Sequence, residues 1–153
     1  MDKYEEECKR IMQKYPEEIR KVFDWENCQL EFDFLGFLES YWISLSSDFT
    51  VIDFGCNQAV QSIYFDKQRK YIGVDCCVPL EYRFVVNENV EHFKKTIQEF
   101  IEVDLPSLNL NMGKVFAICS YVPDDEARKM VRNTFKYYRD IYCSEVYERL
   151  PQI

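Results

Sequence analysis

Glycine, histidine and long apolar runs are all scarce in this chain of 153 residues. Only 4 glycines and one histidine, His92, are present, which disfavours low-complexity segments and catalytic triads that require histidine. No apolar run approaches the roughly 20 residues of a membrane-spanning helix. The charged start, MDKYEEECKR, lacks the apolar core of a signal peptide. No membrane association is therefore expected.

Cysteine is present, but without the spacing of metal ligands. The 7 cysteines include no C-x-x-C pair, and the adjacent pair Cys76-Cys77 cannot easily hold one ion in the tetrahedral geometry that zinc prefers. Their odd number argues against a framework of disulfide bonds. We therefore expect no metal site and a reduced, cytoplasmic protein.

The balance of charge is acidic, with a net charge of −8 and a pI of about 4.8. This disfavours nucleic acid as a partner, because phosphate binding needs clustered positive charge. The densest basic runs, at 67–70 and 128–132, are expected to be solvated faces or ends of helices, and His92 is expected at the surface. With 47% hydrophobic and 30% charged residues, the chain can bury the core of one domain.

Three apolar runs predict buried strands. Residues 49–54, 71–75 and 114–119 are rich in β-branched and aromatic side chains, as is typical of strands buried on both faces. A helical stripe at 59–64 separates the first two runs. A strand, a helix and a strand within about 25 residues predict a parallel pair with a right-handed crossover.

Weaker patterns complete the predicted core. Residues 91–97 predict a third strand, 98–105 a short helix closed by Pro106, 124–138 an amphipathic helix and 140–147 a last strand. The alternation of strands and helices indicates an α/β fold, a doubly wound and mostly parallel Rossmann-like sheet.

The first part of the chain carries apolar positions at helical spacing. We therefore predict a single domain over 1–153, with an N-terminal helical cap at 1–47 and the α/β core at 48–153. The cap is also a candidate surface for a protein partner or for a homodimer.

A glycine-poor loop follows the first predicted strand. The stretch from Asp53 to Ala59, DFGCNQA, is followed by Asp75 at the end of the second strand. Together they resemble the first two motifs of the class I S-adenosylmethionine-dependent methyltransferases, over roughly residues 49–125. Asn57 stands at the second glycine position of the family, and asparagine enters the left-handed region at low cost. The G-x-G-x-x-G pattern of NAD and FAD sites is absent.

The resemblance implies a site for S-adenosylmethionine as cofactor. The loop residues Gly55, Cys56 and Asn57 would approach its methionine part, and the N-terminus of the next helix would receive its carboxylate. Asp53 would orient the loop from beneath. Asp75 would hold the ribose, although an aspartate at a strand end can equally cap a turn.

Further contacts are implied at the next strand ends. Cys76 and Val78 would form a wall for the adenine, and Gln98 would meet its edge. Ser120 would contact the cofactor, and the segment that it begins would face the transferred methyl group. There Tyr121 and Asp124 are the catalytic candidates. This segment lacks the Asn/Asp-Pro-Pro-aromatic motif, which disfavours methylation of base amino groups.

Four cysteines fall near predicted strand ends: Cys56, Cys76, Cys77 and Cys119. A thiol or metal site is one interpretation. Small apolar residues that line a crevice are the favoured one, because free cysteine is commonly buried.

Two functions of different classes follow. The first is S-adenosylmethionine-dependent methyl transfer to a small-molecule or protein acceptor. The second is a catalytically inactive methyltransferase-like protein that binds a protein partner. A different nucleotide-binding α/β domain is a third reading. Because six residues follow Tyr147, the last antiparallel strands of the family are expected to be missing.

Overall fold

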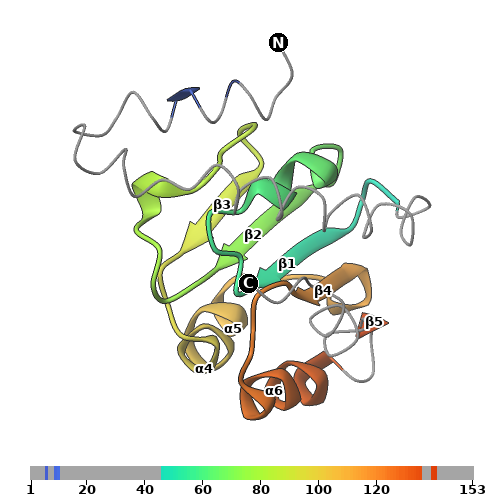
Figure 1. Cartoon of the computed structure of the whole chain (residues 1–153). Coiled ribbons are helices and arrows are strands. Elements are labelled where there is room, and N and C mark those ends of the chain that lie inside the picture. The colour runs from blue at the N-terminus through green and yellow to red at the C-terminus, as the bar shows by residue number, and fades with distance from the viewer. Residues whose placement is uncertain (1–5, 7–8, 11–45, 136–138, 141–153) are drawn as a thin grey trace.

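A five-stranded parallel sheet forms the centre of the molecule (Figure 1). The computed structural model describes residues 6, 9, 10, 46–135 and 139–140. The strands are β1 Thr50–Phe54, β2 Lys70–Val74, β3 Val90–Phe93, β4 Val115–Cys119 and β5 Arg139–Asp140. Their order is β3-β2-β1-β4-β5, and each pairing is parallel. The predicted strands at 49–54, 71–75 and 114–119 are confirmed, and the α/β class with them.

Register brings four strand ends to one edge of the sheet. Phe54 at the end of β1 pairs with Val74 of β2 and Cys119 of β4, and Val74 pairs with Phe93 of β3. The third strand therefore ends before the predicted position, at Phe93. Every loop that leaves this edge starts at the same level, so residues far apart in the sequence become neighbours there.

The helical segments depart from the predictions in two places. After β1 the helical stripe expected at 59–64 forms a six-residue 3-10 helix, η1 Val60–Phe65, and not an α-helix. After β3 the helix is not closed by Pro106. It runs through α4 Ile97–Glu99, the π turn η3 Phe100–Asp104 and α5 Leu105–Ser107. Pro106 lies in the first turn after the π turn, where its missing N–H group is not needed.

Three further elements are η2 Leu80–Tyr82, η4 Met112–Lys114 and α6 Asp125–Phe135. Helix α6 confirms the predicted amphipathic helix, whose last positions lie outside the described residues. Most of the predicted N-terminal cap and all of the predicted strand 140–147 except Asp140 also lie outside them. Within the described part of the chain, no helix has the length and apolar character needed to cross a membrane.

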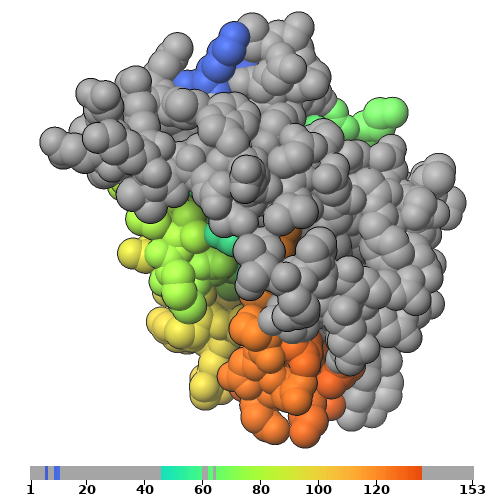
Figure 2. Space-filling view, viewed as in Figure 1, coloured from blue at the N-terminus to red at the C-terminus, as the bar shows by residue number. Residues whose placement is uncertain are grey.

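One face of the sheet packs on the helices that follow β3 and β4. Ile52 and Phe54 of β1 contact Phe100, Val131 and Phe135 in a single buried cluster. The rings of Phe54 and Phe100 meet edge to face, with centroids 5.8 Å apart. Figure 2 shows residues of α4 and α5 beside those of α6 on the surface of the molecule.

The other face is covered by η1 and the segment around η2. Phe65 of η1 lies 6.2 Å from the ring of Tyr71 and 6.1 Å from that of Phe116. Phe84 and Arg83, just after η2, are fully buried. Both faces of β1, β2 and β4 are therefore covered, which is why their sequences are apolar at nearly every position.

Two charged or titratable residues are more buried than the sequence predicted. Arg128 is only 7% exposed, and its Nη1 donates to the carbonyl oxygen of Val122 at 2.6 Å. His92 on β3 packs against Gly73, where an added Cβ would lie 2.4 Å from the imidazole Nδ1. The expectations of a solvated basic run at 128–132 and of a surface histidine were therefore wrong for these two residues.

Candidate functional site

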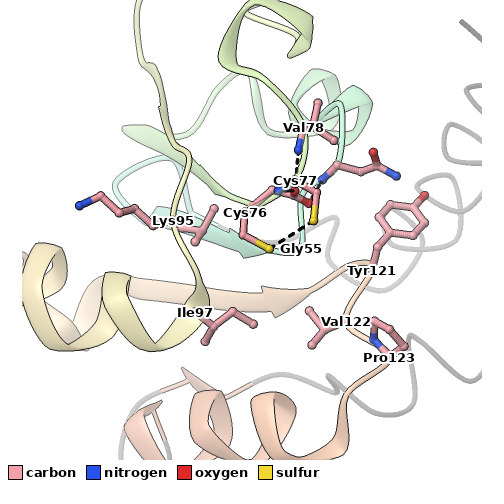
Figure 3. A pocket seen from close by; sticks show the side chains of 12 residues that line it. Gly55, Cys76, Cys77, Val78, Lys95, Ile97, Tyr121, Val122 and Pro123 are labelled. Atoms are coloured by element: carbon pink, nitrogen blue, oxygen red, sulfur yellow. Dashed lines mark hydrogen bonds between the residues drawn. The ribbon is translucent and has the colours of Figure 1, made fainter. Parts of the chain in front are cut away.

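A cavity of about 340 Å³ opens at the carboxyl edge of the sheet (Figure 3). It lies between the loops that follow β1, β2 and β4 and the start of α4. Its lining residues are Gly55, Asn57, Val74, Asp75, Cys76, Cys77, Val78, Lys95, Ile97, Tyr121, Val122 and Pro123. The walls are mainly apolar, and Asp75 and Lys95 are the charged side chains among them.

The loop after β1 has an unusual backbone. Gly55, Asn57 and Ala59 all have positive φ, at 66°, 56° and 61°. The prediction that Asn57 adopts the left-handed conformation is confirmed. Ala59 takes the same conformation without the polar side chain that eases it for asparagine, and it is completely buried.

Gly55 is required by the chain itself. A Cβ at this position would lie 2.7 Å from the carbonyl oxygen of Tyr121 and 2.7 Å from Cγ2 of Val122. The two loops are also joined by a hydrogen bond from the Tyr121 N–H to the Gly55 carbonyl oxygen, at 3.1 Å. The space that a side chain at residue 55 would need is thus filled by the loop after β4.

Asp75 joins the loops after β1 and β2. Its Oδ2 accepts from the backbone N–H of Asn57 at 3.0 Å, and its Oδ1 accepts from those of Cys77 at 2.8 Å and Val78 at 3.1 Å. A carboxylate offers about four acceptor sites, so roughly one remains, on Oδ2. Asp75 therefore does cap a turn, and it keeps the capacity for one further donor.

Asp53 lies beneath the loop and outside the cavity. Its carboxylate is completely buried and accepts hydrogen bonds from the hydroxyl groups of Ser120, at 2.5 Å, and Tyr71. Burial and the charge of Asp53 raise the pKa of Tyr71 well above its usual value. This network ties β1, β2 and β4 together below the cavity.

The cysteines divide into two groups. Cys56 and Cys119 are buried, whereas Cys76 and Cys77 are exposed and line the cavity. Cys56 lies near Gly73 and Arg83 on the covered face of the sheet. The expectation of small buried residues thus describes the first group and not the second.

Some of the remaining predicted site residues line the cavity and others do not. Val78 and Tyr121 line the cavity. Gln98 is exposed on α4, where its Nε2 donates to Glu102 at 3.2 Å. Asp124 caps α6, since its Oδ1 accepts from the N–H of Glu126 at 2.9 Å. Neither Gln98 nor Asp124 is among the lining residues, and Ser120 faces Asp53.

Arg83 was not foreseen as part of the site. Its guanidinium donates to the carbonyl oxygens of Asp75 at 2.6 Å, Val78 at 2.9 Å and Phe93 at 2.9 Å. It thus holds the Asp75–Val78 rim of the cavity from behind. A basic residue between two aromatic ones, Tyr82-Arg83-Phe84, was the only available signal of burial.

Lys95 and Ile97 were likewise not foreseen. Lys95 Nζ lies 3.6 Å from Oδ2 of Asp104 across the first turns of the helical run. Thr96 and Glu99 form a capping box that starts this helix beside the cavity, with the Glu99 N–H donating to Thr96 Oγ1 at 3.1 Å. The cap therefore decides where Lys95 and Ile97 stand.

Comparison with known proteins found no matching family model, no matching curated protein and no matching solved structure. Among the residues that the structure describes, no group of three or more His, Cys, Asp or Glu side chains could hold a metal ion. The geometry of the cavity is therefore the basis for assigning a function.

Proposed function

We propose that this chain is a doubly wound, Rossmann-like protein whose cavity binds S-adenosylmethionine for methyl transfer to a small molecule or a protein. One observation carries the proposal, which is the position of the cavity. It lies at the carboxyl edge of the sheet, where β2 and β3 extend to one side of β1 and β4 and β5 to the other. Ligands of doubly wound sheets bind at this reversal of strand order.

The size and walls of the cavity suit part of a nucleoside. Its volume of about 340 Å³ is at the lower end of the range of small-molecule sites, roughly 300–1,000 Å³. Val78 and Ile97 offer apolar surface to a planar base. The remaining acceptor site on Asp75 can take one ribose hydroxyl group.

Tyr121 is the lining residue best suited to face the reacting group. An aromatic ring attracts a cation through its π face, and the sulfonium of S-adenosylmethionine supplies the electrophilic methyl group when the cofactor is bound. The chain has to align the acceptor and exclude water. Because Asp124 caps α6, Tyr121 carries this role alone among the two predicted catalytic residues.

A second candidate function is a methyltransferase-like protein without catalysis. Asp75 already accepts three backbone hydrogen bonds, and the space beside Gly55 is filled by Tyr121 and Val122. Helix η1 has only six residues and no side-chain cap, so it offers little to a cofactor carboxylate. These features favour a cavity whose polar groups and space are already used by contacts within the chain and not by a cofactor. Its protein partner would bind elsewhere on the chain.

Calorimetric titration with S-adenosylmethionine and S-adenosylhomocysteine, with NAD as a control ligand, separates the candidates. We expect micromolar binding of the first two ligands alone. Val78→Trp fills the cavity without removing a hydrogen bond and should weaken binding at least tenfold. Val103→Trp is the matched control, because Val103 is 63% exposed and is not among the lining residues.

Absence of binding at millimolar S-adenosylmethionine would reject the enzyme and favour the second candidate. Equal binding of NAD would indicate a different nucleotide-binding domain. Binding that survives in Val78→Trp would place the ligand outside this cavity.

A further inference from the structure

Two adjacent thiols stand at the wall of the cavity. Cys76 and Cys77 are both exposed, and their Sγ atoms lie 3.3 Å apart. Figure 3 shows both sulfur atoms directed into the space above Val122. The function proposed above gives no role to these two thiols acting together.

The backbone under the two thiols is firmly held. The N–H of Cys77 donates to Asp75 Oδ1 at 2.8 Å, and the carbonyl oxygen of Asp75 accepts from Arg83 Nη2 at 2.6 Å. The turn is therefore fixed on both sides of Cys76. Two thiols on such a turn are arranged in advance for one shared ligand, which reduces the entropy lost on binding.

We propose that Cys76 and Cys77 form a chelating site for a soft trivalent metalloid centre, of which a monosubstituted arsenic(III) compound is the representative. At a bond length of about 2.3 Å from sulfur to the bound centre, the separation of 3.3 Å between the sulfur atoms gives a bond angle of about 90°. A trivalent centre with a lone pair has bond angles near this value. The inference rests on the thiols and is independent of the proposed methyl transfer.

Other two-thiol chemistry fits less well. Tetrahedral zinc needs a wider angle, of about 109°, and two more ligands, and no group of three or more metal-ligating side chains occurs among the described residues. A linear two-coordinate ion would hold the sulfur atoms about 4.6 Å apart at the same bond length. The separation of 3.3 Å between the two Sγ atoms is too short for either.

A disulfide between the two residues is also disfavoured. The Cα atoms of neighbouring residues are about 3.8 Å apart, below the usual range of about 4.4–6.8 Å for a disulfide. The bond would be strained and easily reduced. The hydrogen bond to Cys77 and partial burial raise the pKa of Cys76, which lowers the thiolate fraction that attacks disulfides and alkylating reagents.

The binding step is a substitution without a change of oxidation state. With phenylarsine oxide, both S–H bonds and the arsenic–oxygen bond break, two arsenic–sulfur bonds form, and one water molecule leaves with both thiol protons. The product is a nine-membered ring that contains the arsenic atom, both Sγ atoms and the covalent path between the two adjacent residues. No oxidant or reductant takes part.

The test uses the full chain, one equivalent of phenylarsine oxide and intact-mass spectrometry in millimolar glutathione. A monothiol at this concentration displaces arsenic held by one cysteine, whereas a chelate resists it through its high effective concentration. We expect one adduct, with the mass of phenylarsine oxide less one water, that dithiothreitol removes. Cys76→Ser and Cys77→Ser should each reduce the retained adduct by about tenfold or more, while Cys56→Ser retains it.

Three results would overturn the proposal. The wild-type chain could lose the arsenical to glutathione, or both serine variants could retain it. The purified chain could also contain a Cys76–Cys77 disulfide, seen as resistance to the arsenical until it is reduced. Cys76 and Cys77 are both exposed, so their replacement by serine should preserve the fold. Circular dichroism of each variant checks this, and a loss of the arsenic adduct from a folded variant then reflects the missing thiol.

Discussion

Arg83 offers the sharpest test of how the cavity rim is held. Its side chain is completely buried, and it bonds to backbone carbonyl oxygens at the ends of β2 and β3. The guanidinium donates to backbone carbonyl oxygens and to the Cys56 sulfur, and none of these partners carries a formal charge. The positive charge is therefore stabilised by peptide dipoles, and the carbonyl groups depend on the guanidinium in turn.

Replacement of Arg83 by methionine preserves much of the apolar volume and removes every donor. The carbonyl oxygen of Phe93 retains its hydrogen bond from the N–H of Asp75, at 3.2 Å. The carbonyl oxygens of Asp75 and Val78 lose the hydrogen bonds that the arginine donates. An unpaired buried acceptor costs about 1–3 kcal/mol, and removal of a buried charge restores part of its desolvation energy. We expect the free energy of unfolding to fall by about 2–4 kcal/mol for the two acceptors.

Urea denaturation followed by circular dichroism measures this change. With a slope of about 2 kcal/mol per molar urea, the midpoint should fall by about 1–2 M. Arg69→Met is the matched control, since Arg69 is exposed and should change stability by no more than about 0.5 kcal/mol. Arg83→Lys should lie between the two, because an ammonium group cannot span the same set of carbonyls. Equal midpoints for Arg83→Met and Arg69→Met would refute the reasoning.

Three other predictions concern the residues around the cavity. Gly55→Ala should destabilise the fold by about 2–4 kcal/mol, because its Cβ would lie 2.7 Å from a carbonyl oxygen at positive φ, whereas Asn57→Gly should be nearly neutral; equal melting temperatures would contradict this. Burial lowers the pKa of His92 to about 4 from its ordinary 6.5, so protonation favours the unfolded chain, and stability present above pH 6.5 should be lost as the pH falls towards 4. The expected loss between pH 7 and 5 is at most about 2 kcal/mol, and a urea series in which His92→Gln keeps the same pH slope would reject that cause. Ser120→Ala removes a donor to the buried carboxylate of Asp53 and should cost about 2 kcal/mol in thermal unfolding; a change below about 0.5 kcal/mol would show that the hydroxyl group contributes little.

Most of the sheet could be predicted because its signals are local. β1, β2 and β4 are covered on both faces, so each is a short apolar run that ends at a glycine, an aspartate or a serine. β3 has only half-buried residues at the side of the sheet, and its pattern was correspondingly weak. The left-handed position at Asn57 was also predictable, because few residues other than glycine adopt positive φ easily.

The placement of the site residues could not be read in the same way. Gln98 and Asp124 follow strands at the expected spacing, but a capping box and a helix cap turn them away from the cavity. Ile97 takes the wall position instead, one residue earlier. A shift of one position on a helix rotates a side chain by about 100°. The end of a strand cannot be predicted from sequence to within one residue, so the side chain that faces the cavity cannot be predicted either.

The sequence by itself determined a parallel α/β sheet and a tight turn after its first strand, since hydrophobic period and backbone preference act over a few residues. Only the tertiary structure decided that Asp75 would bond to three N–H groups of two loops, that Arg83 would be buried behind them and that Cys76 and Cys77 would face a cavity. These outcomes depend on strand register, which brings together residues as far apart as Gly55 and Tyr121. Register is a property of the assembled sheet, because it is selected by the packing of both faces at once.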